Sequence, residues 1–121
     1  MTQDRVPTLS HATWTDLGLW LLRRRRRFRV EGRSMLPTLE PGKEVLINPW
    51  AYSHKLPQVQ DLVVAEHPQR PGFRLIKRVM AVDGDGCCDL RGDNPEESTD
   101  SRQFGWVKKA SILGQAICHL P

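Results

Sequence analysis

From about residue 28 onward, the chain alternates short apolar runs with polar segments rich in proline, glycine, aspartate and asparagine. The apolar runs are of strand length rather than helix length, and turn-forming residues flank them. They predict β-strands at residues 28–31, 44–48, 61–66, 73–80, 87–91 and 112–119. The nine prolines and nine glycines agree with many tight turns between them. The sequence therefore predicts a mainly β architecture.

The segment before residue 28 has a different pattern. Trp14, Leu17 and Leu21 follow one another at helical spacing and predict a short helix over residues 11–25, with Ser10 as its N-cap. Its fully apolar part would be about 9 Å long as a helix, whereas the hydrocarbon core of a bilayer is about 30 Å thick. We therefore expect no transmembrane segment. The arginines follow the apolar run rather than precede it, which argues against a cleavable signal peptide.

A chain of 121 residues has room for one domain with one core. We therefore expect two regions. Residues 1–27 form a tail with the short apolar helix and an arginine run, and residues 28–121 form a single folded domain. The composition, 39% hydrophobic and 26% charged, is ordinary for a soluble protein.

The positive charge of the chain is concentrated in one segment. Of the 18 basic residues, six are the arginines at 23–27 and 29; without them 12 basic residues stand against 14 acidic ones, and the net charge changes from +4 to −2. A solvated basic stretch, a contact with an anionic membrane surface and a contact with an acidic partner all fit this segment. Nucleic-acid binding is disfavoured, because an arginine run without a set of interleaved aromatic residues is weak support for it.

The three cysteines form no disulfide pattern, since Cys87 and Cys88 are adjacent and Cys118 is remote. An odd number of this kind favours reduced thiols in a reducing compartment. We therefore expect a cytoplasmic protein, with peripheral contact to a membrane left open. A zinc site built from these cysteines and His119 lacks the paired ligand spacing of structural zinc sites. We expect neither a metal nor a cofactor.

One stretch, residues 32–39 with the sequence Gly-Arg-Ser-Met-Leu-Pro-Thr-Leu, cannot continue as a regular strand or helix. Gly32 permits a sharp turn. Pro37 fixes its own φ and disfavours a helical conformation at Leu36. These constraints hold the hydroxyl of Ser34 in one place. By itself, the stretch is more typical of a serine that caps a short helical turn.

A serine hydroxyl becomes an effective nucleophile only where a base removes its proton. None of the four histidines has an obvious carboxylate to orient it, and the better candidate is Lys77, inside the apolar run 73–80. A neutral lysine near pH 7 needs a pKa roughly three units below about 10.4, a change of about 4 kcal/mol that burial can supply. Taken alone, Lys77 is more typical of an exposed strand edge that shares a basic face with Arg78.

A third stretch, residues 92–105, is dense in residues that define tight turns. It has the sequence Gly-Asp-Asn-Pro-Glu-Glu-Ser-Thr-Asp-Ser-Arg-Gln-Phe-Gly. Together with residues 32–39 and the Ile-Lys-Arg-Val of residues 76–79, it closely resembles the three sequence boxes of the type I signal peptidase family of Ser/Lys proteases. The resemblance covers roughly residues 30–107. It implies a signal peptidase I/LexA-like catalytic β-core of short antiparallel strands.

The resemblance also implies a catalytic dyad. Ser34 would be the nucleophile of a serine-type endopeptidase, Lys77 the general base, and Ser98 would hydrogen-bond and orient the lysine amine. The backbone N–H of Ser34 would donate a hydrogen bond to the oxyanion. Many family members place a second donor, a serine, two positions before the nucleophile. That position is Gly32 here, so any second donor must come from the backbone or from water.

Other positions take supporting roles in the same resemblance. Asp100 and Arg102 would form an ion pair that braces the loop, while Asp93 and Asn94 would shape the same corner. Three residues close to the dyad in sequence are candidates for the wall of the substrate cleft: Met35, Leu36 and Ile76.

Within the family, the chain is most similar to the short nickel-type superoxide dismutase maturation proteases. The similarity lies in its length, in a tryptophan- and leucine-rich patch followed by arginines, and in residues 32–39. It implies a protein substrate, the nickel superoxide dismutase precursor, from which an N-terminal extension is removed. Signal-peptide processing at a membrane surface and a non-catalytic binding module of the same fold stay open. A self-cleaving repressor is disfavoured, because the chain contains no Ala-Gly or Cys-Gly dipeptide.

Overall fold

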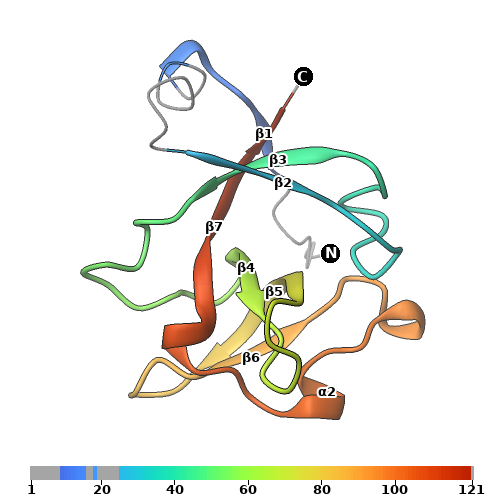
Figure 1. The fold of residues 1–121 in the computed structure, drawn as a ribbon, viewed down its shortest axis with the longest axis vertical. Helices are drawn as coiled ribbons and strands as arrows, with labels where there is room; N and C mark the ends of the chain where they lie inside the picture. The colour runs from blue at the N-terminus through green and yellow to red at the C-terminus, as the bar shows by residue number, and fades with distance from the viewer. Residues whose placement is uncertain (1–8, 16–17, 19–24, 121) are drawn as a thin grey trace, which may run out of the picture.

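The computed structural model describes residues 9–15, 18 and 25–120, and this part of the chain is organised around one seven-stranded β-sheet (Figure 1). The strands are β1 (Ser10–His11), β2 (Arg26–Arg29), β3 (Glu44–Asn48), β4 (Leu62–Glu66), β5 (Arg74–Val82), β6 (Cys88–Arg91) and β7 (Ile112–His119). Short helical segments follow β6: η1 (Pro95–Glu97), α2 (Ser101–Phe104) and η2 (Lys109–Ser111). The order in the sheet is β2-β3-β7-β4-β5-β6 with antiparallel neighbours, and β1 pairs with β7 in parallel.

The mainly β, antiparallel architecture predicted from the sequence is confirmed. The predicted strands at 44–48 and 112–119 have the observed bounds, and the other four begin and end within two residues of the observed strands. This agreement follows because apolar runs and turn residues are local signals that the chain carries wherever it packs.

The N-terminal segment differs from its prediction only in part, because the described residues 14, 15 and 18 are helical within the helix predicted over residues 11–25. Ser10 and His11 do not begin a helix but pair as β1 with the end of β7, and Leu9 before them packs against the hydrophobic core. Most of the helix predicted over residues 11–25 lies outside the described residues. The arginines of β2 are extended, so this part of the arginine run is a strand. No helix in the described part is long and apolar enough to cross a membrane.

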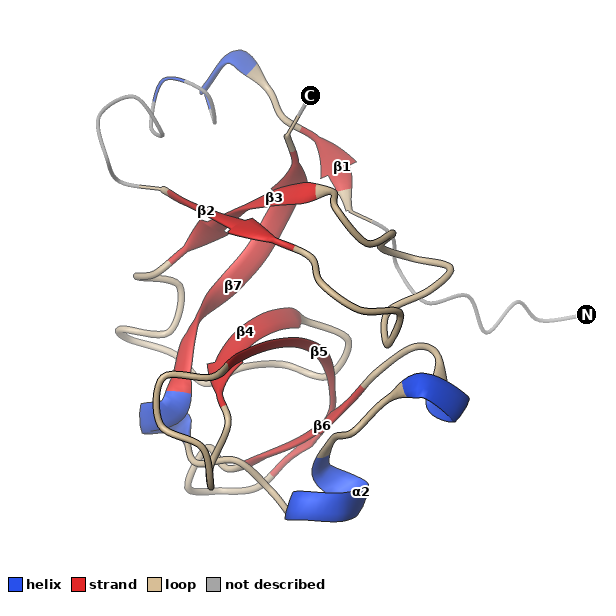
Figure 2. Ribbon diagram, turned by 45° about the vertical axis from the view of Figure 1, so that its right-hand side comes forward, coloured by secondary structure: helices blue, strands red, loops and turns tan. Residues whose placement is uncertain are grey.

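β7 joins the two halves of the sheet, with β2 and β3 at one of its ends and β4, β5 and β6 at the other (Figures 1 and 2). Its C-terminal half pairs with β3 and its N-terminal half with β4, and both ladders contain a register shift. At Gly114 an added Cβ would lie 2.6 Å from Ile47 Cγ2 and 2.7 Å from the carbonyl oxygen of Asn48. Glycine therefore lets β3 approach β7 at the point where the strand passes from one partner to the other.

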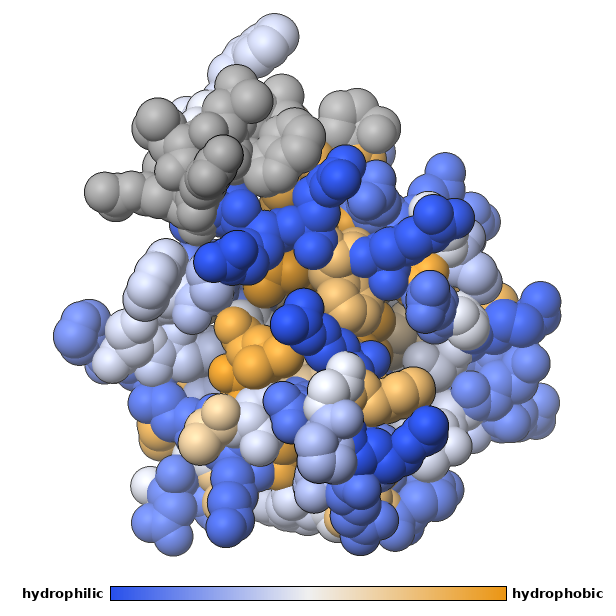
Figure 3. Space-filling model, in the orientation of Figure 1, coloured by the Kyte–Doolittle hydropathy of each residue, from blue (hydrophilic) through white to orange (hydrophobic). Residues whose placement is uncertain are grey.

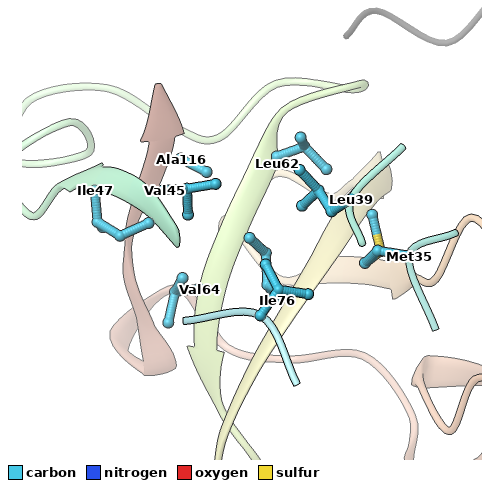
Figure 4. Packing of buried hydrophobic residues seen from close by; sticks show 9 residues of the cluster. Met35, Leu39, Val45, Ile47, Leu62, Val64, Ile76 and Ala116 are labelled. Carbon is cyan, nitrogen blue, oxygen red and sulfur yellow. The ribbon is translucent and has the colours of Figure 1, made fainter. Parts of the chain in front are cut away.

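Two hydrophobic clusters lie on the two faces of β4, which explains its uninterrupted apolar sequence. The first cluster consists of Val30, Met35, Leu39, Val45, Ile47, Leu62, Val64, Ile76 and Ala116 (Figure 4). The second consists of Tyr52, Val63, Ala65, Val79, Cys88, Leu90 and Val107. Full burial of a valine, leucine or isoleucine side chain stabilises a fold by about 1.5–3 kcal/mol. Because β5 contributes to both clusters, its position relative to the rest of the sheet is well determined.

Candidate active site

The turn that carries Ser34, residues 32–39 and called the serine turn below, is anchored by apolar side chains next to Ser34 in the sequence. Met35 (1% exposed) and Leu39 are buried in the first cluster, and the N–H of Leu39 donates to the carbonyl of Met35 at 3.0 Å. Gly32, with φ of +73°, adopts the left-handed conformation that glycine favours. Ser34 itself is half-buried, and its backbone N–H has no acceptor within the described part of the chain. The turn therefore presents one hydroxyl and one amide donor at a rigid position.

Lys77 lies in the middle of β5, opposite Val63 of β4, and is only 3% exposed. Burial lowers the pKa of its amine; the negative charge of Asp100 partly opposes this shift, and the positive charge of Arg102 adds to it. The alternative of an exposed lysine on a basic strand face is therefore wrong. A lowered pKa is the property that a lysine needs to act as a base near neutral pH.

A chain of hydrogen bonds leads from Lys77 to a buried ion pair. Lys77 Nζ donates to Ser98 Oγ at 3.1 Å, and Ser98 Oγ donates to Asp100 Oδ2 at 2.6 Å. Asp100, which is 0% exposed, also accepts from Arg102 Nε and Nη2 at 2.9 and 2.7 Å and from the N–H of Gly92 at 2.9 Å. Burial raises the pKa of Asp100, but the hydrogen bonds from Arg102, Ser98 and Gly92 outweigh it and hold that pKa well below its usual range.

The position of Asp100 follows from local structure. Asp100 is the N-cap of α2, where its side chain accepts from the N–H of Arg102, while Gln103 Oε1 accepts from the N–H of Asp100 at 2.9 Å. This reciprocal arrangement is a capping box. Ser101 Oγ accepts from the N–H of Leu90 at 2.8 Å and so ties α2 to β6. The short helix thereby places the carboxylate under Ser98.

A second buried ion pair, which the sequence pattern did not predict, lies beside these residues. Arg78 (1% exposed) donates from Nε and Nη2 to the two carboxylate oxygens of Asp93 at 3.1 and 3.0 Å, and Thr38 Oγ1 donates to the same carboxylate at 2.6 Å. Asp93 thus connects β5 to the serine turn. A signal existed in the sequence: side chains alternate along a strand, so Lys77 and Arg78 in one buried strand must each find a separate partner.

Gly92 and Asn94 bring the 92–105 loop against the serine turn. The N–H of Asn94 donates to the carbonyl oxygen of Ser34 at 2.8 Å, and the Asn94 side-chain amide donates to the carbonyl oxygen of Arg33 at 3.0 Å. A Cβ on Gly92 would lie 2.5 Å from the carbonyl oxygen of Ser34 and would overlap the hydroxyl of Ser98. Space, and not backbone conformation, therefore requires glycine at position 92.

Ser34 and Lys77 line one cleft, with a volume of about 790 Å³, between β2, the serine turn and β5. Figure 3 shows apolar side chains exposed between β2 and β5 on this face, with hydrophilic side chains around them. Within the described residues no hydrogen bond joins Ser34 Oγ to Lys77 Nζ; such catalytic hydrogen bonds are often long before the substrate is bound. The described ranges also contain no group of three histidine, cysteine, aspartate or glutamate side chains placed to hold a metal ion.

The three predicted cleft residues differ in where the structure places them. Ile76 lines the cleft, although its side chain is largely buried in the first cluster. Met35 belongs to the core, and neither Met35 nor Leu36 is among the residues that line the cleft. The side chain of Met35 therefore turns inward and anchors the serine turn, and a place for Leu36 in the substrate cleft stays a prediction.

The cleft lies between two strand edges that have unpaired backbone groups in the described part of the chain. β6 pairs with β5 only from residue 78 onward, which leaves residues 74–77 unpaired on that side. β2 pairs with β3 along one edge only. An extended peptide can add to such edges through main-chain hydrogen bonds. A peptide bound in this way would pass Ser34 and Lys77.

Comparisons with known proteins give several matches. The family model for signal peptidase, peptidase S26, matches residues 19–90. The chain is 33% identical over 109 residues to mitochondrial inner membrane protease subunit 2 of Danio rerio, covering 73% of the chain and 60% of that protein. It is 36% identical over 70 residues to signal peptidase I of Pseudomonas aeruginosa, covering 48% of the chain and 25% of that protein. The chain thus spans about three fifths of the length of the inner membrane protease.

Proposed function

The chain belongs to the peptidase S26 signal peptidase family, and we propose on this basis that it is a serine endopeptidase with Ser34 and Lys77 as its catalytic dyad. The observation that supports the dyad most directly is a buried lysine of lowered pKa in the same cleft as Ser34. Such a lysine has a larger neutral fraction at a given pH, and only the neutral amine can accept a proton. The chain spans only part of the length of these relatives, so the activities in their names are not transferred to it, and the site carries the assignment of the dyad.

In the first half of the reaction, Ser34 Oγ attacks the carbonyl carbon of the scissile peptide bond while its proton passes to Lys77 Nζ. Ser98, which accepts a hydrogen bond from Nζ, holds the amine in place. The oxyanion accepts a hydrogen bond from the N–H of Ser34. Because Gly32 has no side-chain donor, any second hydrogen bond to the oxyanion must come from the backbone or from water. When the intermediate collapses, the C–N bond breaks and Lys77 gives its proton to the departing amine.

In the second half, water attacks the carbonyl carbon of the acyl-enzyme and gives one proton to neutral Lys77. The new intermediate collapses by releasing Ser34 Oγ, which takes the proton back from Lys77. The product is a free carboxyl group, and both residues return to their starting protonation states. The arrangement of one nucleophile and one base therefore suffices for both steps.

For the substrate we propose a precursor protein that enters the cleft as an extended segment and loses an N-terminal extension. The nickel superoxide dismutase precursor is the specific substrate that the sequence resemblance favours. The matched relatives are named as inner membrane proteases and a signal peptidase, which makes a secretory precursor the competing substrate. A binding module without activity is the third possibility, and it would leave the buried Lys77 without a chemical role.

The test uses both substrates and one variant. Purified protein is mixed separately with the nickel superoxide dismutase precursor and with a secretory precursor, and the products are measured by intact mass, with Ser34→Ala in parallel. We expect one N-terminal cut in the dismutase precursor that the variant does not make. Cleavage of the secretory precursor alone would move the substrate to signal-peptide processing and leave the dyad in place. No cleavage of either would overturn the enzymatic proposal in favour of the binding module.

The two substrates also differ in where they are found. For a dismutase precursor we propose a cytoplasmic enzyme, as the cysteine pattern suggests, whereas signal-peptide processing requires contact with a membrane. A flotation assay with vesicles that contain anionic lipid separates these cases. Protein that stays at the bottom of the gradient supports the first, and protein that floats supports the second.

A further inference from the structure

We propose that the cleft selects substrate segments with acidic side chains near the cleaved bond, and that Arg29 and Arg74 bind these acidic side chains. This inference rests on the proposed function in one respect, because it takes the cleft that leads to Ser34 as the substrate site. It adds a class of substrate to that function, namely peptide segments of negative charge. It also assigns two residues that determine this specificity.

The first observation is the distribution of charge. The lining of the cleft contains six basic and two acidic residues; with Lys77 neutral, as the proposed function requires, five arginines against two glutamates leave a formal charge of +3. The basic residues are Arg27, Arg29, Arg33, Arg70, Arg74 and Lys77, and the acidic ones are Glu31 and Glu97. The described walls of this cleft therefore carry more positive than negative charge.

The second observation is that three of these arginines, Arg29, Arg70 and Arg74, form no ion pair within the described residues, and Arg70 among them lies over the ring of Phe73, 4.3 Å from its centroid. Arg33 is paired with Glu97 at 2.9 Å, and Arg27 lies 3.7 Å from Glu44. Arg29 and Arg74 are both exposed, and their guanidinium groups are free to meet a ligand.

The position of the two arginines adds a geometric argument. Arg29 is the last residue of β2 and Arg74 the first residue of β5. These strands supply the unpaired edges on either side of the cleft. Glu66 lies opposite Arg74 on β4 but forms no ion pair with it in the described structure. A peptide that extends between the two edges would therefore run between two unpaired positive charges.

The physical consequence is electrostatic selection. A cleft lined by charges of one sign concentrates its field and attracts ligands of the opposite sign. Each exposed charge pair contributes modestly, about two- to fivefold in affinity, and the effect weakens as salt screens it. An anionic lipid headgroup carries the same sign of charge. A peptide is favoured over a lipid headgroup as the ligand, because Arg29 and Arg74 line the same cleft as Ser34. A peptide segment bound there can reach the Ser34 hydroxyl.

The experiment measures peptide binding without turnover, so its result can be interpreted even if the protein proves to have no peptidase activity. The Ser34→Ala protein is titrated with three capped twelve-residue peptides that carry an uncharged dye. They share a background of alanine and serine and differ only at three positions. All three positions are glutamate in the first peptide, glutamine in the second and lysine in the third. The same titrations are made with Arg29→Gln and Arg74→Gln added, singly and together. Arg26→Gln is the matched control, since Arg26 is exposed on the same strand but does not line the cleft.

We expect the glutamate peptide to bind at least about fivefold more tightly than the glutamine peptide, and the lysine peptide to bind least. The preference should fall by about two- to fivefold with each cleft variant, stay unchanged with Arg26→Gln, and shrink in high salt. Equal binding of the glutamate and glutamine peptides would overturn the inference. An equal loss with Arg26→Gln would also overturn it, since the charge would then act from outside the cleft. Binding to anionic vesicles that depends on Arg29 and Arg74, without any preference among the peptides, would assign the two arginines to a lipid surface instead.

Discussion

Lys77 Nζ donates a hydrogen bond to Ser98 Oγ at 3.1 Å, and Ser98 Oγ in turn donates to Asp100 Oδ2 at 2.6 Å. A buried amine needs an acceptor, but a carboxylate in direct contact would raise its pKa and keep it protonated. Ser98 supplies a neutral acceptor and separates the amine from the charge of Asp100. The relationship orients Lys77 without pairing it with an anion, which agrees with the lowered pKa of its amine.

The proposed dyad predicts that Ser34→Ala and Lys77→Met each abolish turnover. Removal of the nucleophile or of the base is expected to lower the rate by at least about 10²–10⁴-fold. Methionine keeps the length of the buried side chain and removes its amine, so the fold should persist. Turnover is measured by intact mass on a cleaved precursor, and thermal melting by circular dichroism checks the fold. Near-normal cleavage by either folded variant would rule out the dyad.

The lowered pKa of Lys77 predicts how activity depends on pH. The base must be neutral, so kcat/KM should rise about tenfold per pH unit below the pKa of Lys77 and level off above it. The levelling should occur below pH 10.5, the ordinary lysine value. A profile that stays flat between pH 6 and 9, with the chemical step rate-limiting, would count against Lys77 as the base.

The same shift has a consequence for stability. Because the pKa of Lys77 is lower in the folded state than in the unfolded state, the unfolded state binds more protons between the two values. The free energy of unfolding should therefore rise with pH from the folded pKa up to about 10.5, and Lys77→Met should remove that part of the rise. Urea unfolding of both proteins across this range measures the difference.

Ser98→Ala should lower the rate by less than either dyad variant. The lysine remains buried and basic, but its amine loses the acceptor that orients it, and we expect a loss of about 10- to 100-fold, within the range for positioning effects. The pH at which activity levels off should also change, since the environment of the amine changes. An unchanged rate and an unchanged profile would remove Ser98 from the site.

Gly92→Ala should disturb both the fold and the site. The added methyl would meet the carbonyl oxygen of Ser34 and the hydroxyl of Ser98, so one of them must move. Overpacking of this kind typically costs about 1–3 kcal/mol in the free energy of unfolding. Gly84→Ala is the matched control, because nothing lies within 4 Å of a Cβ at that position. Equal stability and activity of the two variants would contradict the close approach at Gly92.

The ion pair between Arg78 and Asp93 should matter more for stability than the exposed pair between Arg33 and Glu97. Arg78→Met leaves the Asp93 carboxylate largely buried without its cation, a change that typically costs about 3–5 kcal/mol. Arg33→Gln removes an exposed charge and should leave the urea midpoint nearly unchanged. If both variants unfold at the same urea concentration, the buried pair does not hold the serine turn as the structure indicates.

Local signals explain what could be predicted. Apolar runs between turn residues located the six strands from β2 to β7, because strand length and turn propensity depend on neighbours in sequence. The resemblance in three short boxes pointed to Ser34, Lys77 and Ser98, which the structure places around one cleft and one hydrogen-bond chain. The pairing of β1 with β7 was missed because it depends on a distant strand edge and not on the sequence around Ser10.

The sequence by itself determined where strands β2 to β7 lie and which residue types could carry chemistry, since short segments of the chain contain both signals. Only the tertiary structure decided that Met35 faces the core, that Arg78 is buried against Asp93, and that Arg29 and Arg74 stand on opposite edges of one cleft. The physical reason is that burial and charge pairing depend on which remote segments pack together. In this protein those contacts are made where β5 and the 92–105 loop meet the serine turn.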